Sequence, residues 1–154
     1  MNHAAVIHEF GHALLCVLHE VPVLSLSAES GSAHCRHATP DDPRLGLEIA
    51  VAGAAMLSAF EQRPGGVADF GGENDLLEAR RLAAVVDPEA DPQAVVDHAF
   101  RRLRRWFLGN MPTLKTLLPE VFVTLAEHGE IDGPILYDAL ARARGYLSAV
   151  DVSA

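Results

Sequence analysis

The first segment of the chain, Ala4 to Leu18, is apolar almost all round. His8, Glu9 and His12 are its main polar interruptions. A surface helix keeps a polar stripe, so a segment without one is typical of a helix that is buried on all sides. The pattern therefore predicts a buried helix that carries a polar cluster, and buried polar groups need partners.

The chain changes in character after this helix. Pro22 ends it, and the partly alternating, β-branched residues from Val21 to Leu26 predict a short strand. From Ala28 to Pro43 the residues are mostly Ser, Gly, His, Pro and Asp, which predicts a loop or a weak hairpin. We therefore expect one small β element near residues 21–40.

Five further helices are predicted from apolar periodicity and from the prolines and glycines between the periodic segments. They span Leu45 to about Gln62, Asn74 to about Val86, Pro92 to about Leu108, Pro112 to His128 and Gly133 to about Tyr146. The helix from Leu45 is rich in alanine and glycine, so a neighbour could approach it closely. Asp87 and Asp91 each precede a proline and are candidate N-caps. The expected fold class is mainly α, with a C-terminal helical bundle.

The length and composition are those of an ordinary globular domain. The chain has 154 residues, 49% of them apolar and 21% charged. Such values disfavour disordered, collagen-like and coiled-coil classes. We therefore expect a single domain that covers residues 1–154.

The charge and the apolar runs restrict the partners. Asp and Glu number 21 against 12 Lys and Arg, a net charge of -9, so we expect no nucleic-acid partner. The longest nearly unbroken apolar run, Ile49 to Phe60, is shorter than the roughly 18 residues that span a membrane. The N-terminus lacks the basic leader of a signal peptide. Cys16 and Cys35 are too few for a disulfide scaffold. These features predict a cytoplasmic protein without a membrane partner.

The sharpest chemical signal is His8-Glu9-Phe10-Gly11-His12. Helical residues four apart are offset by about 40°, so the two imidazoles lie one turn apart on one face and could hold a single ion. A zinc ion lowers the pKa of water to about 7, and Glu9 is placed to take the proton as a general base. Two core histidines that are merely hydrogen-bonded would not explain a carboxylate in the same apolar surroundings.

A catalytic zinc usually has three protein ligands and a water, so one more ligand is expected downstream. His19 lies about 10 Å from His12 along the helix, too far to share the ion. Glu29 and Glu48 are candidates, yet neither has a matching helical context. Asp75, which follows a glycine-rich segment and opens a helix, is the best candidate among several acids.

Three blocks of the sequence together resemble a known family. They are His8-Glu9-Phe10-Gly11-His12, Val51-Ala52-Gly53-Ala54-Ala55 and Gly72-Glu73-Asn74-Asp75-Leu76. In order and character these blocks resemble the peptidase domain of the FtsH-type ATP-dependent zinc metalloproteases. The similarity covers roughly His3 to Arg142, because the region from Trp106 to Gly133 is also similar to the closing part of that domain.

The resemblance implies both a fold and a site. It implies a zincin-like helical domain with a zinc-site part of about residues 1–86 and a C-terminal helical part of about residues 92–146. It implies that His8, His12 and Asp75 bind Zn²⁺ and that Glu9 is the general base of an endopeptidase. The peptidase domains of the family assemble as six-fold rings, which suggests a homo-oligomer.

His8 is preceded by only seven residues, so we expect a stand-alone domain without the ATPase module that precedes it in the family. We therefore expect peptides or unfolded proteins as substrates, which a separate unfoldase could deliver. The family's acidic pair after the small-residue block is missing, since Leu57 and Ser58 stand there. This difference motivates a second hypothesis, a zinc-bound regulatory or interaction domain with lost or gated proteolysis. A third hypothesis is metal-free packing of the histidines.

Three weaker signals remain. His34, Cys35 and His37 are metal-ligand residue types, but their spacing matches no known zinc finger, so we favour a solvated loop. A cluster of four arginines could bind an acidic partner: Arg101, Arg102, Arg104 and Arg105. In an acidic protein we favour a solvated helix face that pairs with the chain's own carboxylates. Cys16 is expected to be a packed core thiol.

Overall fold

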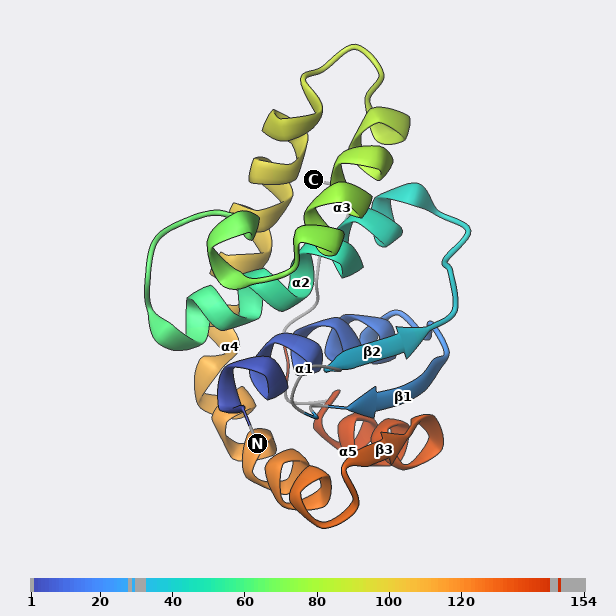
Figure 1. Cartoon of the computed structure of the whole chain (residues 1–154), viewed down its shortest axis with the longest axis vertical. Helices are drawn as coiled ribbons and strands as arrows, with labels where there is room; N and C mark the ends of the chain where they lie inside the picture. The colour runs from blue at the N-terminus through green and yellow to red at the C-terminus, as the bar shows by residue number, and fades with distance from the viewer. Residues whose placement is uncertain (1, 28, 30–32, 145–146, 148–154) are drawn as a thin grey trace.

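The protein is mainly helical, with a small antiparallel sheet (Figure 1). The computed structural model describes residues 2–27, 29, 33–144 and 147, and for residues 139 and 141–144 the backbone alone. Its helices are α1 (His3–Leu18), α2 (Pro43–Glu61), the 3-10 helix η1 (Val67–Phe70), α3 (Glu73–Val86), α4 (Pro92–His128) and α5 (Gly133–Arg144). Its strands are β1 (Val23–Ser27), β2 (His34–His37) and β3 (Glu130–Asp132). The prediction of a mainly α fold is confirmed.

Short polar residues begin three of the helices. The side chain of Asn2 accepts hydrogen bonds from the first backbone amides of α1, and Asp42 caps α2 in the same way. Asp91 caps α4, with a proline at the first helical position, as its sequence predicts. Asp87 was expected to be an N-cap but closes α3 instead, because its backbone amide donates to Ala83 within that helix.

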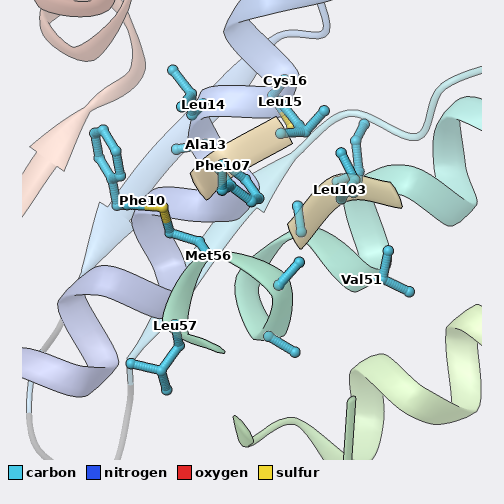
Figure 2. Packing of buried hydrophobic residues seen from close by; sticks show 14 of the residues in the cluster. Phe10, Ala13, Leu14, Leu15, Cys16, Val51, Met56, Leu57, Leu103 and Phe107 are labelled. Atoms are coloured by element: carbon cyan, nitrogen blue, oxygen red, sulfur yellow. The ribbon is translucent and has the colours of Figure 1, made fainter. Parts of the chain in front are cut away.

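Helix α2 is the centre of the molecule and packs against α1, α3 and α4. Its small residues permit a close approach to α1. A Cβ atom on Gly11 would lie 2.6 Å from the carbonyl oxygen of Ala52, so only glycine fits there. Figure 2 shows Phe10, Met56 and Phe107 among the apolar side chains that gather where α1, α2 and α4 meet. All three side chains are fully buried.

The sheet has the strand order β2-β1-β3, and both pairings are antiparallel. The strand predicted over Val21 to Leu26 is β1, and it forms a hairpin with β2, which lies in the segment predicted as a loop or weak hairpin. No strand was expected between the last two predicted helices, but the three residues of β3 pair with Ser25, Leu26 and Ser27 of β1. The pairing partner lies about a hundred residues earlier in the chain, so no local pattern could indicate this strand.

Helix α4 corrects a second expectation. Two helices were predicted, separated before Pro112, yet one helix continues from Pro92 to His128 with Pro112 and Pro119 inside it. Proline removes one backbone hydrogen bond and crowds the carbonyl four residues earlier, which usually ends or kinks a helix. Here the apolar stripe continues across the proline. Its buried members are Leu103, Phe107, Met111, Leu114, Leu118, Val121 and Leu125. Packing along this unbroken stripe holds the helix together, and its later part reaches β3 and α5 (Figure 1).

Among the described residues one helix, α2, is long and apolar enough to cross a membrane by length and composition alone. Within its most apolar window, 67% of the residues are buried inside the protein. A core helix has the same composition for a different reason, because all its faces contact other helices. The hydropathy of α2 is therefore weak evidence for a membrane span.

Candidate metal centre

Three side chains from two distant segments meet at one point. The Nε2 atoms of His8 and His12 lie 3.1 Å apart. The Oδ2 atom of Asp75 lies 2.8 Å from Nε2 of His8 and 3.2 Å from Nε2 of His12. Both histidines are buried, whereas the side chain of Asp75 is 28% exposed, so the group lies just beneath the surface. These three residues form a group that could hold a metal ion.

The other ring nitrogen of each histidine faces a backbone carbonyl. Nδ1 of His8 lies 3.1 Å from the oxygen of Phe70, and Nδ1 of His12 lies 2.6 Å from the oxygen of Ile49. A carbonyl oxygen only accepts, so each Nδ1 carries the proton and donates it. In a neutral imidazole this leaves a lone pair on Nε2, and such an outer hydrogen bond is usual for histidines that bind metals.

When both imidazoles are neutral, the three atoms that face one another are therefore all acceptors. Two imidazole lone pairs and a carboxylate oxygen within about 3 Å of one another repel unless a proton or a cation lies between them. The chemistry of the donor set thus fits a bound cation.

Glycine at position 53 lets α2 lie directly against both imidazoles. A Cβ atom built on Gly53 of α2 would lie 2.5 Å from Nε2 of His12 and 2.6 Å from Nε2 of His8. Any larger residue would therefore collide with both rings. Helix α2 supports the site through its backbone, because the Ile49 carbonyl holds His12 and Gly53 contacts both histidines.

The segment from η1 to α3 completes the group. Phe70, whose carbonyl holds His8, ends η1, and Asp75 lies in the first turn of α3. Gly71 and Gly72 between them have positive φ values of 88° and 85°, which glycine adopts without strain. The N-terminus of a helix favours a carboxylate, because its dipole presents partial positive charge there. The prediction that Asp75 lies with the two histidines agrees with this geometry.

Glu9 lies beside the group on α1 and is partly exposed. Its side chain lines two cavities that meet at the three residues. Burial raises the pKa of Glu9 above its usual value, and the charge of Asp75 adds to this, whereas His12 and His8 act in the opposite direction. A carboxylate with a raised pKa accepts a proton more readily than one in water.

Asp75 and His12 influence each other strongly. Burial alone would raise the pKa of Asp75, but hydrogen bonds and charge from His12 and His8 prevail and hold it well below its usual range. Burial alone would lower the pKa of His12, but the hydrogen bond and the charge of Asp75 prevail and raise it. Asp75 is therefore a carboxylate, the form that binds a cation.

The other candidate ligands lie elsewhere. Glu48 is 2% exposed and forms a buried ion pair with Arg102 of α4, so α2 directs it away from the histidines. Glu29 is exposed, and its carboxylate lies near Gly129 at the end of α4. His19 is the C-cap of α1 and does not belong to the group of three.

The weaker signals of the sequence have mixed outcomes. His34, Cys35 and His37 do not form a solvated loop but belong to β2, are partly buried and line the cavity beside Glu9 and His12. Burial raises the pKa of the Cys35 thiol, so this residue stays protonated at neutral pH. Cys16 is fully buried, as expected of a core thiol, and burial raises its pKa to about 12.

The arginines of α4 do not form one solvated face. Arg101 and Arg105 are exposed, but Arg102 pairs with buried Glu48 and Nε of Arg104 donates to Oγ of Ser58 at 2.8 Å. Two of the four side chains thus attach α4 to α2. The expected pairing with the chain's own carboxylates holds for Arg102, inside the protein.

Three contributors to the site could not be named from the motif. They are the carbonyl of Ile49, the carbonyl of Phe70 and the close approach that Gly53 allows. The small-residue block around Gly53 was a usable signal, since alanine and glycine on a buried helix indicate a close approach. The two carbonyls left no such signal, because every residue has one.

A search against models of known protein families found no match, and no curated protein matches the sequence.

Proposed function

We propose that the protein is a zinc-dependent endopeptidase in which His8, His12 and Asp75 bind the ion and Glu9 is the general base. The observation that carries this proposal is the convergence of two imidazole nitrogens and one carboxylate oxygen beside a partly exposed glutamate. The resemblance of the sequence blocks to FtsH-type peptidase domains supports the same assignment of roles.

The donor set favours zinc. Two nitrogens and one oxygen match the ligand types of catalytic zinc sites, which keep a fourth position open. With bond lengths near 2.0–2.1 Å, tetrahedral ligands lie about 3.3 Å apart. The observed separations of 2.8, 3.1 and 3.2 Å are close to this value. Bound there, zinc would supply Lewis-acid chemistry for the hydrolysis of a carbonyl.

Glu9 would perform the proton transfers. Its carboxylate borders both cavities beside the ligand group, so a water and a peptide carbonyl could reach it from solvent. Glu9 takes a proton from the attacking water and then passes it to the nitrogen of the leaving amine. The Nδ1 protons of His8 and His12 stay hydrogen-bonded to their carbonyl partners and keep both imidazoles oriented.

Such a site acts on chains that fit into open cavities. We propose peptides and unfolded proteins as substrates, delivered to the site in the cytoplasm by diffusion or by a separate unfoldase. A homo-oligomer remains part of this proposal, by analogy with the family that the sequence resembles.

The test is the substitution Glu9→Gln. This change keeps the size of the side chain but removes the base, so hydrolysis of casein should fall at least about a hundredfold while the zinc content stays at one ion per chain. Zinc is measured by atomic emission and hydrolysis by release of fluorescent fragments. Glu89→Gln is a matched control, because it makes the same change at an exposed acid away from the ligand group.

Two outcomes would contradict the proposal. Undiminished hydrolysis by Glu9→Gln would remove Glu9 from the mechanism. One zinc per wild-type chain without turnover of any unfolded substrate would favour a zinc-bound regulatory or interaction domain instead.

A further inference from the structure

Two cavities of different chemistry flank the metal ligands. The first has a volume of about 600 Å³ and the second about 270 Å³. Glu9, Ala33 and Asp75 line both of them, so the cavities meet at the candidate centre. An extended chain that crosses the centre would therefore place one side chain in each cavity.

The first cavity, here called the acidic pocket, carries excess negative charge on its wall. Apart from the ligand group and Glu9, its charged residues are Glu61, Arg63, Asp69 and Glu73. Arg63 pairs with Glu61 and lies over the ring of Phe70, so its charge is already matched within the wall. Asp69 and Glu73 remain, and both are exposed. A cavity wall of one sign attracts side chains of the opposite sign.

The second cavity, here called the apolar pocket, lies between β2 and the helices α2 and α3. Its apolar lining is formed by Pro40, Gly46, Ile49, Ala50 and Leu82. Glu78 also lines it, but two hydrogen bonds from Arg81 match this charge. His34, Cys35 and His37 form the opposite wall on β2. The volume is large enough for a leucine or phenylalanine side chain, and the wall offers apolar contact with it.

We propose that the centre selects polypeptide segments with a basic side chain on one side of the scissile bond and a large apolar side chain on the other. The basic side chain occupies the acidic pocket and the apolar side chain occupies the apolar pocket. This inference rests on the proposed function, because it assigns the substrate class of the same site.

The test uses fluorogenic peptide pools of equal length. The two residues that flank a central bond are lysine or glutamate on one side and leucine or serine on the other, in both orders. For the zinc-loaded wild type, kcat/KM should be highest for lysine with leucine. It should fall about fivefold on exchange of lysine for glutamate and at least about tenfold on exchange of leucine for serine.

Substitutions within each pocket should change one preference and leave the other. Glu73→Lys should reduce the lysine preference, whereas Glu89→Lys, the same charge change on the exposed turn before α4, should not. A Cβ atom on Gly46 would lie 3.2 Å from Cδ1 of Leu82, inside the apolar pocket. Gly46→Ala should therefore reduce the leucine preference, whereas Gly109→Ala, where nothing lies within 4 Å, should not.

A binding measurement separates this inference from the proposed function. Fluorescence anisotropy of the same peptides with zinc-loaded Glu9→Gln should show the same order of dissociation constants. Preferential binding without cleavage by the wild type would overturn the proposed function and keep the inference. Cleavage with equal kcat/KM for all pools, or preferences that the pocket substitutions do not move, would overturn the inference alone. A zinc-loaded protein that neither binds nor cleaves any pool would overturn both.

Discussion

At the scale of single residues, the candidate centre depends on atoms that point at one another. The Nδ1 atoms donate to backbone carbonyls, and these hydrogen bonds fix the orientation of both imidazole rings. In this orientation the two Nε2 atoms face each other and Asp75. This arrangement follows from which ring nitrogens donate and which accept hydrogen bonds, and not from charge alone. The absence of a side chain at Gly53 then lets both imidazoles keep these positions against α2.

Gly53→Ala tests this close approach of α2 directly. The added methyl group would lie 2.5 and 2.6 Å from the two Nε2 atoms, so one imidazole or α2 must move. We expect zinc affinity to fall about tenfold to a hundredfold, which is the range seen for residues that orient metal ligands. Competition with a chromophoric chelator measures it. Gly109→Ala is the matched control and should leave the affinity unchanged; equal affinities for both variants would contradict the assignment.

At the scale of elements, α2 is the helix that both the core and the site use. Its buried Glu48 pairs with Arg102, and its Ser58 accepts from Arg104, so polar contacts attach α4 to it. The apolar stripe of α4 continues the same attachment beyond Pro112. Pro112 suggested a break, but buried residues continue at spacings of three and four across it, and this spacing was the signal that outweighed the proline.

The ion pair between Glu48 and Arg102 should matter for stability. Arg102→Met leaves the carboxylate of Glu48 buried without its partner, which costs about 3–5 kcal/mol of unfolding free energy in comparable cases. Adding Glu48→Leu should recover most of this loss, because the uncompensated charge is then gone. Urea unfolding followed by circular dichroism measures both. The exposed neighbour Arg101→Met should change the free energy by less than about 0.5 kcal/mol; a similar loss in this control would argue against the pair.

At the scale of the whole molecule, the candidate centre joins segments that are far apart in the chain. His8 and His12 come from α1, while Asp75 lies 67 residues after the first of them on α3. The backbone of α2 and the end of η1 hold the imidazoles from two further sides. A cation bound there links these elements only when the chain is folded.

Zinc should therefore stabilise the fold. At a free concentration a thousand times the dissociation constant, binding adds about 4 kcal/mol to the unfolding free energy. For a chain of this size that corresponds to a rise in Tm of about 8–16 °C. Thermal unfolding with zinc and with EDTA measures the shift. Asp75→Ala should lose most of it, and a shift that persists in this variant would show that zinc binds elsewhere.

The sequence by itself determined what depends on neighbours within a few residues. The apolar run around His8 and His12 indicated a buried helix, and the four-residue spacing placed both imidazoles on one face. Prolines, glycines and the N-cap Asp91 marked most helix ends within one or two residues. These features are local, because a helix repeats every 3.6 residues and its caps lie within one turn.

Only the tertiary structure decided which distant groups meet. The sequence left three acids as candidates for the third ligand: Asp75, Glu29 and Glu48. The packing of α3 against α2 brings Asp75 to the histidines, and the packing of α4 against α2 pairs Glu48 with Arg102. The same holds for β3, which is a strand because its backbone pairs with the edge of β1. Contacts between residues that are far apart in the chain depend on how whole helices pack, and no short pattern records that.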